Sequence, residues 1–392
     1  MIVCDLTHAY TPTSGGIRTY VDAKRQYVLE HTDHTHVLVV PGEEDSQERG
    51  ERWATYRIKS PVIPGAAPYR FFLRYGAIVE ALREATPLVV AVHTPFTELW
   101  SALRFRDRHA RRALVSGFYH TDLTGAYVGS TARKFAGSFL GERAERLSKR
   151  YVRSAFARCD LVLAPSTLQT ERLARIGIPN AHSIELGVDL ETFHPGRRDA
   201  AVRAELGVPE DTLLLFYAGR LDAEKRVFTM ADAVARVNRE RPAHLVMAGN
   251  GPHRKALIER SAAGVPLTVL PYQEDKLRLA RLMASSDLYL TAGPHETFGL
   301  SVVEAQACGL PVVGVAAGAL IERVDEATGR LGPMDDAVAM AANVLAVAAN
   351  REAMGTQARR RVEAQYSWRA TFDHLFSLYD VERRRTAPPL GF

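Results

Sequence analysis

The chain has 392 residues, 46% of them hydrophobic and 24% charged, with a formal net charge of +5. This composition is that of a folded soluble protein, and the length predicts two domains of roughly 200 residues each. No apolar run approaches the roughly 20 residues of a membrane span, and no basic segment followed by an apolar run opens the chain. We therefore expect a cytoplasmic protein, and the scattered Cys4, Cys159 and Cys308 favour the same reducing compartment.

Short β-branched runs alternate with longer stretches of helical periodicity along the chain. Strands are predicted at 2–6, 36–40, 88–92, 113–118 and 160–164, and again at 213–219, 244–249, 267–270, 287–291 and 311–315. Strands that alternate with helices indicate parallel sheets covered on both faces. We predict an α/β fold with two Rossmann-like, doubly wound domains and a cleft between them, in which a ligand binds at the carboxyl ends of the strands.

The domain boundary is expected near "HPGRRDA" (194–200), where Pro, Gly and charge interrupt the pattern. The N-terminal domain is therefore predicted at 1–192 and the C-terminal domain at 193–365. The amphipathic stretch 366–385 is predicted as a final helix that packs back on the N-terminal domain.

Three glycine-containing loops follow predicted strands. In "TPTSGGIRTY", Gly15 and Gly16 open a helix, whose N-terminus favours an anion, although a plain tight turn explains the pair equally well. In "YAGRLDAEKR", Gly219 precedes Arg220 and Lys225, two cations that suit a diphosphate, with a solvated basic loop as the alternative. In "MAGNGPHRKAL", Gly251 turns the chain from strand into helix.

The stretch "PHETFGLSVVEAQACGLPVVGV" places two acidic residues, Glu296 and Glu304, in an apolar segment. A glycosidase-like acid/base pair holds its carboxyl groups roughly 5 to 10 Å apart. Eight helical residues span roughly 12 Å of rise, so this spacing favours two carboxylates that hold different parts of one long ligand. A helix from Gly299 would also present free N–H groups near Phe298 and Leu300.

A metal site is not expected. The sequence has no D-x-D motif, and "HTDHTH" (31–36) precedes a strand whose alternation turns some of these side chains towards solvent.

Together these motifs resemble retaining glycosyltransferases of family 4, which have the GT-B fold. "HETFGLSVVEA" is similar to the E-x7-E signature of that family, and the Gly15–Gly16 loop, "GRLDAEKR", "GNGP", "ELGVDLETFHP" and the "YSW" helix match it in order and spacing. The stretch "GVAAGALIERV" (314–324) departs from the G-G-x-P-E of many relatives. With "YHT" (119–121), it resembles the subgroup that forms mannosides and glycolipids.

The resemblance implies roles for individual residues. Glu296 would bind hydroxyls of the donor sugar and Glu304 the ribose, while Arg220 and Lys225 would neutralise the diphosphate. The remaining donor-binding candidates are Gly15, Gly16, Gly219, Gly251, Tyr272, Phe298, Gly299 and Leu300.

In the N-terminal domain, the resemblance places His120 of "GFYHTD" next to the sugar as a catalytic residue. His93 of "VHTPF" and Asp189 of "GVD" are candidate acceptor-side residues. Asp189 would alternatively cap a helix.

The segment 133–158 contains eight Lys and Arg residues against Glu142 and Glu145. Its exposed stripe is expected to consist of Arg143, Arg146, Arg150 and Arg153. Such a basic amphipathic helix can lie on an anionic membrane, or it can be an ordinary solvated face. No aromatic interleaving or recognition motif indicates nucleic-acid binding.

We therefore expect a retaining, metal-independent hexosyltransferase that needs no cofactor. Its donor would be a UDP-sugar or GDP-mannose and its acceptor a membrane lipid or lipid-linked glycan, with the enzyme peripheral at the inner face of the membrane. The alternatives are a nucleotide-sugar epimerase of the same fold and a non-catalytic membrane-bound scaffold.

Overall fold

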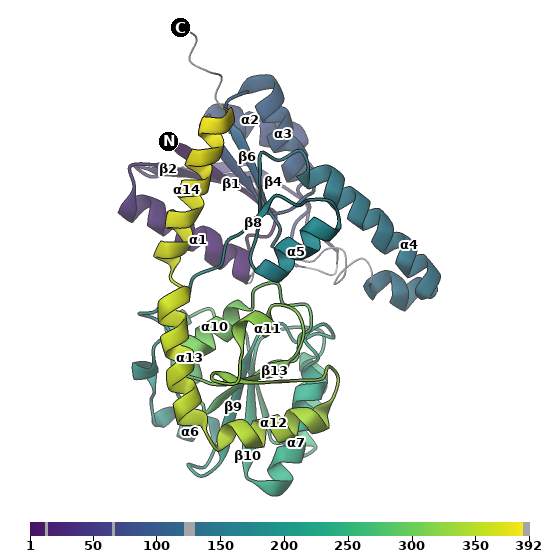
Figure 1. The fold of residues 1–392 in the computed structure, drawn as a ribbon, viewed down its shortest axis with the longest axis vertical. Helices are drawn as coiled ribbons and strands as arrows, with labels where there is room; N and C mark the ends of the chain where they lie inside the picture. The colour runs from purple at the N-terminus through teal and green to yellow at the C-terminus, as the bar shows by residue number, and fades with distance from the viewer. Residues whose placement is uncertain (12–14, 65–66, 121–129, 387–392) are drawn as a thin grey trace. The chain divides into compact units, whose positions relative to one another are not determined.

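The computed structural model describes residues 1–11, 15–64, 67–120 and 130–386, with the backbone alone for 130–141 (Figure 1). The chain divides into two compact units. The first is Met1–Leu186 together with Trp368–Phe392, and the second is Gly187–Ser367. The boundary expected after residue 192 thus falls inside the second unit.

The first unit contains, in the described part of the chain, an eight-stranded sheet with the order β3-β4-β2-β1-β5-β6-β7-β8. Its strands are β1 (Ile2–Leu6), β2 (Thr35–Gly42), β3 (Ser46–Arg49), β4 (Trp53–Lys59), β5 (Val89–Val92), β6 (Leu114–Phe118), β7 (Leu161–Ala164) and β8 (Ala181–Ser183). All neighbours pair in parallel except β3, which is antiparallel to β4. The strand order reverses direction between β1 and β5, which makes their carboxyl ends the place for a ligand.

Helices cover both faces of this sheet. They are α1 (Gly16–His31), α2 (Tyr75–Ala85), α3 (Thr97–His109), α4 (Ser130–Phe156), α5 (Thr167–Arg175) and α14 (Trp368–Thr386). One face is apolar: Cys4 and Leu6 of β1 pack in one core cluster with Leu82 of α2 and Leu99 of α3. Because strand side chains alternate, Asp5 faces the opposite side.

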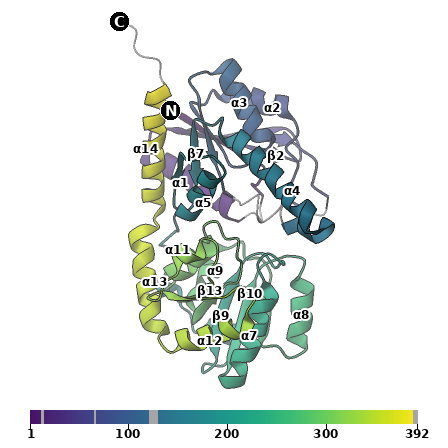
Figure 2. The same cartoon turned by 45° about the vertical axis from the view of Figure 1, so that its right-hand side comes forward.

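Helices α1 and α14 lie side by side on that opposite face of the first sheet (Figures 1 and 2). The Tyr20 ring of α1 has its centroid 5.5 Å from that of Phe372 in α14, and Tyr27 is 5.6 Å from Phe376. This aromatic seam joins the first and the last helices of the chain in one unit.

The second unit contains, among the described residues, a parallel six-stranded sheet with the order β11-β10-β9-β12-β13-β14. The strands are β9 (Leu213–Ala218), β10 (Ala243–Ala248), β11 (Leu267–Leu270), β12 (Leu288–Leu290), β13 (Val312–Val315) and β14 (Gly329–Gly332). The helical segments are η2 (Pro195–Arg197), α6 (Ala201–Leu206), α7 (Val227–Glu240), α8 (Arg254–Ala262), α9 (Lys276–Ala284), α10 (Leu300–Ala307), α11 (Leu320–Arg323), α12 (Ala337–Ala348) and α13 (Arg351–Gln365).

The chain order in the second sheet also reverses, here between β9 and β12. Strands β9, β10 and β11 progress one way, and β12, β13 and β14 progress the other. Loops from β9 and β12 therefore meet at a switch point. The prediction of two doubly wound, parallel-sheet domains is confirmed. Each predicted strand matches a strand of the structure to within two residues at either end, and the structure contains further strands, β3, β4, β8 and β14, that were not predicted.

No helix in the part of the chain that the structure describes is long and apolar enough to cross a membrane.

Candidate active site

The predicted site residues form two groups, one in each unit. In the second unit, Lys225 lies in the loop between β9 and α7, and Glu296 follows β12, the strand next to β9. Lys225 Nζ is 2.5 Å from Glu296 Oε1, and the two side chains are 14% and 19% exposed. Burial disfavours the ammonium, but the carboxylates of Glu296 and Glu224 outweigh it and raise the pKa of Lys225. Lys225 is therefore a cation at neutral pH.

Arg220, at the end of β9, is also paired with carboxylates. Its guanidinium lies 2.5 Å from Asp222 Oδ2 and 2.6 Å from Glu224 Oε2, and the side chain is half exposed. Both cations predicted to hold a diphosphate are thus present at the switch point, where acidic neighbours hold them in place. A polyanion that binds there would compete with these carboxylates.

The loop between Glu296 and α10 depends on a glycine. Gly299 is the N-cap of α10 and has φ 84° and ψ 52°, the left-handed region that strains any residue with a Cβ. The amides of Val302 and Val303 donate to the Gly299 carbonyl, so the amides that precede this first bond of the helix are those of Leu300 and Ser301. A helix N-terminus of this kind favours an anion.

Arg323 supports this loop from within the core, and the sequence did not reveal it as a site residue. It is 1% exposed, its Nε donates to the Phe298 carbonyl at 3.2 Å, and its guanidinium lies 4.3 Å from the Phe298 ring centroid. Nη1 also donates to the Tyr366 hydroxyl at 3.1 Å. Phe298 itself is buried, so its side chain has a structural role, and only its backbone remains available to a ligand.

Glu304 lies within α10 and is partly buried. Burial raises its pKa to about 7, although the Lys276 ammonium partly offsets this. A carboxyl group whose pKa is near neutrality is suited to hydrogen bonding with neutral hydroxyls.

The glycine loops lie where the strands end. Gly15 is the N-cap of α1, and neither it nor Gly16 would bring an added Cβ within 4 Å of another described atom. Packing against the described residues therefore does not require a glycine at either position. Gly219, Gly251 and Tyr272 follow β9, β10 and β11 at the carboxyl edge of the second sheet.

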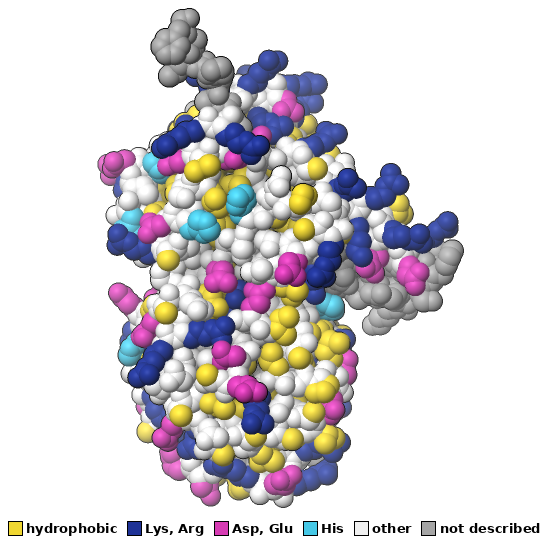
Figure 3. All heavy atoms as spheres, viewed as in Figure 1, with side chains coloured by type: hydrophobic (Ala, Val, Ile, Leu, Met, Phe, Trp, Pro, Cys, Tyr) yellow, Lys and Arg dark blue, Asp and Glu magenta, His cyan; other side chains and the backbone are white. Residues whose placement is uncertain are grey.

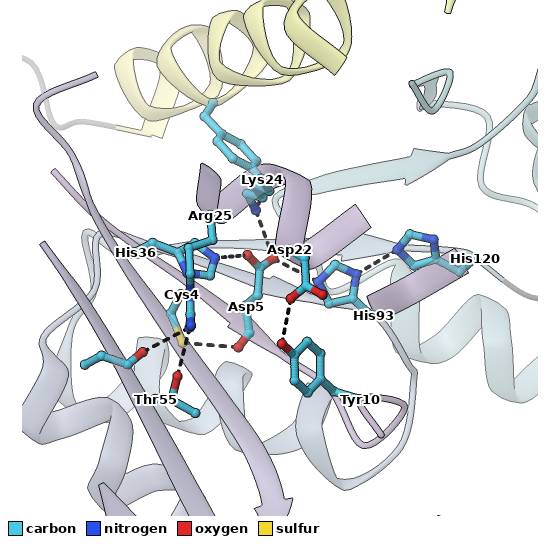
Figure 4. Close-up of polar contacts among 12 residues, drawn as sticks. Cys4, Asp5, Tyr10, Asp22, Lys24, Arg25, His36, Thr55, His93 and His120 are labelled. Carbon is cyan, nitrogen blue, oxygen red and sulfur yellow. Dashed lines mark hydrogen bonds and ion pairs between the residues drawn. The ribbon is translucent and has the colours of Figure 1, made fainter. Parts of the chain in front are cut away.

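In the first unit, a buried chain of polar side chains leads to His120 (Figure 4). His120 Nε2 lies 2.7 Å from His93 Nδ1, and His93 Nε2 lies 2.8 Å from Asp5 Oδ1. His93 follows β5 and His120 follows β6, so both are at the carboxyl edge of the sheet. His120 is 8% exposed and His93 2%.

Asp5 is the centre of this chain. Its carboxylate also contacts Lys24 Nζ at 2.9 Å and His36 Nε2 at 2.7 Å, and all of these side chains are fully buried. Burial favours the neutral acid, but Lys24 and the hydrogen bonds from His36 and His93 outweigh it and hold the pKa of Asp5 well below its usual range.

Part of the 31–36 histidine cluster faces solvent as expected, since His31 is exposed and His34 half-buried. His36 has no exposure, because β2 begins at Thr35 and its next side chain points into the sheet–helix interface. Burial lowers the pKa of His36, and hydrogen bonding to Asp5 only partly offsets this. Among the described residues, no group of three His, Cys, Asp or Glu side chains is placed to hold a metal ion.

A second polar group at this edge was also missed. Glu98 of α3 is fully buried, and its Oε1 lies 2.6 Å from His8 Nδ1 and accepts from the Thr94 hydroxyl at 2.8 Å. His8 follows β1 and Thr94 follows β5, directly after His93. This second group therefore lies at the same carboxyl edge of the sheet as His93. Nothing in the pattern around Glu98 distinguishes it from an ordinary helix residue.

Asp189 behaves as a cap. Its Oδ1 accepts from the amides of Glu191 at 3.1 Å and Thr192 at 3.0 Å. The sequence offered Asp189 alternatively as a helix cap, but residues 190–192 form a turn and not a helix, so what Asp189 caps is this turn.

The solved structures that this chain resembles have the GT-B fold. Sucrose-phosphate synthase from Thermosynechococcus elongatus superposes with a TM-score of 0.76 at 21% identity, over 97% of this chain and 98% of that one. HepE from Anabaena, in complex with UDP and glucose, has a TM-score of 0.72 at 16% identity, over 97% and 100%. These likenesses show the architecture of this chain: two Rossmann-like domains, each with loops that meet at a switch point.

Sequence comparisons identify the family. A model described as Glycosyltransferase Family 4 matches residues 14–192, and one described as Glycosyl transferases group 1 matches 199–364. A GDP-mannose-dependent alpha-(1-6)-phosphatidylinositol dimannoside mannosyltransferase of Mycobacterium tuberculosis is 34% identical over 94% of this chain and 93% of its own. A GDP-mannose-dependent alpha-mannosyltransferase of Corynebacterium glutamicum is 27% identical over 83% and 75%. The chain belongs to glycosyltransferase family 4, as its motifs predicted.

Proposed function

We propose that the protein transfers mannose from GDP-mannose to a hydroxyl of a phosphatidylinositol-based glycolipid, with retention of configuration. The observation that carries the proposal is that Lys225 and Arg220 follow β9, and that Lys225 contacts Glu296, which follows the neighbouring strand β12 and precedes α10. The choice of mannose and of GDP is supported by the activities for which these relatives are named, since they match this chain across both units.

The donor is held by groups of the second unit. Lys225 and Arg220 neutralise the diphosphate, together with the first amides of α10. Glu296 then exchanges Lys225 for hydroxyls of the mannose, and Glu304 accepts hydrogen bonds from the ribose hydroxyls. The close pairing of Lys225 with Glu296 supports this arrangement, because it places the diphosphate site and the sugar site next to one another.

Charge controls the chemical step. Cleavage of the sugar–phosphate bond develops positive charge on the sugar and negative charge on the departing diphosphate, so fixed cations at the diphosphate lower the barrier. The acceptor hydroxyl attacks from the face that the diphosphate leaves, and a phosphate oxygen of the leaving group takes its proton. No protein nucleophile and no metal ion is required, since Lys225 and Arg220 supply the positive charge.

The acceptor side belongs to the first unit, where helix α4 favours a membrane surface. Arg143, Arg146, Arg150 and Arg153 are all exposed, and Leu147 in the same helix is 66% exposed. Lys and Arg side chains gather over α4 in Figure 3, and the helix extends away from the sheet in Figures 1 and 2. An exposed leucine among arginines is typical of a helix that lies on an anionic bilayer.

The test is a transfer assay with radiolabelled GDP-mannose and vesicles that contain phosphatidylinositol mannosides, in the presence of EDTA. We expect labelled glycolipid whose new linkage is alpha by NMR, and parallel reactions with UDP-glucose should give no product. Conversion of the donor alone into an epimer would favour the epimerase, and donor binding without turnover would favour the scaffold. A beta linkage, or loss of activity with EDTA, would overturn the retaining or the metal-independent part.

A further inference from the structure

We propose that Glu224 is a counterion that makes the diphosphate site bind the nucleoside diphosphate product less tightly, relative to the donor, and so speeds product release. It is a positioning residue that pairs with Arg220 and Lys225 when the site is free and pairs with them again as the product leaves. The identity of the ligand rests on the proposed function, whereas the contacts of Glu224 lie within the β9–α7 loop of the second unit.

Glu224 bridges the two cations of this loop. Its Oε2 accepts from Arg220 Nη2 at 2.6 Å, and its Oε1 lies 3.7 Å from Lys225 Nζ. The side chain is 20% exposed, as against 65% for Glu259 on the surface of α8. Within the part of the chain that the structure describes, each ion pair of Glu224 is with one of these two cations. Both carboxylate oxygens thus contact the groups that would hold the diphosphate.

The backbone of the loop is held by groups other than Glu224. Leu221 is buried, and its amide donates to a carbonyl of the loop after β10 at 2.9 Å. Asp222 Oδ1 accepts from the Lys225 amide at 3.1 Å, and Asp222 Oδ2 lies 2.5 Å from Arg220 Nη1. Asp222 therefore shapes the turn and orients the guanidinium. Loss of the Glu224 charge should leave this framework in place.

The formal charge of the free site is negative. Two cations, Arg220 and Lys225, pair with three carboxylates, those of Asp222, Glu224 and Glu296. A site that only had to bind a polyanion tightly would have an excess of positive charge. Because Lys225 and Glu224 are largely shielded from solvent, ions screen their interactions less than those of exposed pairs. The extra carboxylate therefore weakens the binding of an anion, and more so the more charge that anion carries.

Donor and product differ in charge at this site. In GDP-mannose the β-phosphate is esterified to the sugar and carries one negative charge. When the bond from the sugar carbon to the phosphate oxygen breaks, its electron pair stays on that oxygen, and the acceptor hydroxyl gives its proton to the phosphate. A terminal phosphate has a second pKa of about 6, so most of this proton is then lost to solvent at neutral pH. Repulsion from Glu224 thus destabilises bound GDP more than bound GDP-mannose.

Glu224 also replaces the ligand as it leaves. A bound diphosphate accepts from Arg220 and Lys225 in place of Glu224, which then lies beside an anion without these two partners. As the product departs, the carboxylate pairs with both cations again, so neither is left unpaired in a partly buried loop. If Glu224 instead only oriented Arg220 for binding, its removal would weaken the binding of GDP. The two roles predict opposite signs.

The direct test is calorimetric titration of the full-length protein with GDP, with inorganic pyrophosphate and with GDP-mannose. Glu224→Gln keeps an oxygen that accepts from Arg220 but loses the charge. We expect it to lower the Kd of GDP and of pyrophosphate roughly five- to tenfold, and that of GDP-mannose only about two- to threefold. Unchanged or weaker binding of GDP would overturn the proposal, as would an equal gain for GDP and GDP-mannose.

Two further variants separate the effect of charge from support of the loop. Glu224→Asp keeps the negative charge, so its Kd for GDP should stay within about twofold of the wild-type value. Glu259→Gln makes the same charge change as Glu224→Gln at an exposed position of α8 and should leave each Kd unchanged. A residue that only supported the loop would give weaker binding in both Glu224 variants. Urea midpoints that match the wild type show that each titration is made on folded protein.

Steady-state transfer gives a second readout. In Glu224→Gln the inhibition constant of GDP should fall by the same factor of roughly five to ten, while the KM for GDP-mannose changes clearly less. Equal changes in the two constants would contradict a role in product release.

The proposal and the transferase function fail separately. If Glu224→Gln binds GDP and pyrophosphate more tightly but the wild-type protein transfers no mannose, the assigned reaction is wrong and the effect of Glu224 on anion binding stands. If mannose is transferred and the Kd of GDP does not fall in Glu224→Gln, the reaction stands and the proposal is wrong. Wild-type protein that binds neither GDP nor pyrophosphate would overturn both.

Discussion

Lys225 Nζ lies 2.5 Å from Glu296 Oε1, although the two residues are 71 positions apart in the chain. The contact exists because Lys225 follows β9 and Glu296 follows β12, which are neighbouring parallel strands. Gly293 permits it, since a Cβ there would lie 3.0 Å from Lys225 Cδ and 3.3 Å from Glu296 Oε1. The free site is therefore charged but internally neutralised.

Removal of the lysine should abolish most turnover. We expect Lys225→Ala to lower kcat for mannosyl transfer by roughly 10²- to 10³-fold, because a fixed cation at the leaving diphosphate is lost. The measurement is steady-state transfer with saturating donor. Lys255→Ala, on α8 and 90% exposed, is the matched control and should leave the rate unchanged. Wild-type turnover in Lys225→Ala would mean that this loop does not hold the diphosphate.

Donor affinity should depend on the protonation of Glu304. Its pKa is raised to about 7, so the acceptor-only carboxylate becomes dominant as the pH rises through neutrality. We expect the Kd for GDP-mannose, measured by calorimetry, to fall roughly five- to tenfold between about pH 6 and pH 8. Glu304→Gln should remove this dependence, whereas Glu326→Gln, at an exposed position, should preserve it. A pH-independent wild-type Kd would contradict the ribose assignment.

The buried pair of Lys24 and Asp5 should be strongly coupled. We expect Asp5→Asn to lower the free energy of unfolding by about 3–5 kcal/mol, because it leaves the Lys24 ammonium buried and unpaired. The double variant Asp5→Asn/Lys24→Met should lose clearly less than the sum of the two single losses. Urea denaturation measures all three, with the exposed Asp45→Asn as a control that should change little. Strict additivity would argue against a direct interaction.

Stability should decrease in mild acid. Burial lowers the pKa of His36 and His120 below the ordinary 6.5, so the unfolded chain binds protons in this range that the folded chain does not. These two histidines therefore lower the free energy of unfolding as the pH drops below about 6.5, by up to about 1.4 kcal/mol per pH unit each. Glu304, whose pKa is raised to about 7, acts in the opposite direction between that pH and its ordinary 4.5, so the two histidines together outweigh it. Asp5, with its lowered pKa, adds a further loss only below its ordinary 3.8.

Urea midpoints between pH 8 and about pH 4.5 test this acid limb. Substitution of His120 by Gln should make the slope shallower, whereas substitution of the exposed His182 should not. A midpoint that stays constant down to the acid end of this range would show that the buried rings take up protons in the folded state.

Membrane binding should depend on helix α4. We expect wild-type protein to float with vesicles rich in phosphatidylinositol and to be released by high salt, since each basic residue near an anionic surface contributes about 1 kcal/mol. Arg146→Glu/Arg150→Glu should abolish flotation. Arg369→Glu/Arg385→Glu makes the same charge change at exposed positions of α14 in the same unit and should retain it. Binding that is insensitive to both salt and the α4 substitutions would exclude this surface.

The sequence predicted those features that depend on local pattern. Buried runs such as 2–6 and 213–219 gave the strands because β-branched alternation is a local signal. The loops after the predicted strands 213–219 and 287–291 contain Lys225 and Glu296, and both were predicted as site residues because ligands bind where parallel strands end. Strand β3, with the sequence SQER, was not predicted because all four of its side chains are exposed and it pairs only at the sheet edge.

The buried polar chain was beyond the reach of local pattern. Asp5 lies within the apolar run IVCDL, and its burial there is stabilised by the ammonium of Lys24 in α1. Lys24 also donates to the Tyr379 hydroxyl, which is 355 positions further along the chain. His93 was foreseen as an acceptor-side candidate, yet its partners Asp5 and His36 were not. Arg323 escaped for the same reason, since its role depends on packing against Phe298.

Helix α14 has a consequence for the order in which the protein folds. The second unit, Gly187–Ser367, is continuous in sequence, whereas the first is completed only by Trp368 and the residues that follow it. During synthesis, the Tyr379 hydroxyl that accepts from Lys24 emerges from the ribosome last. The unit that is translated first can therefore be completed only after the whole of the second unit has been synthesised, because its aromatic seam needs α14.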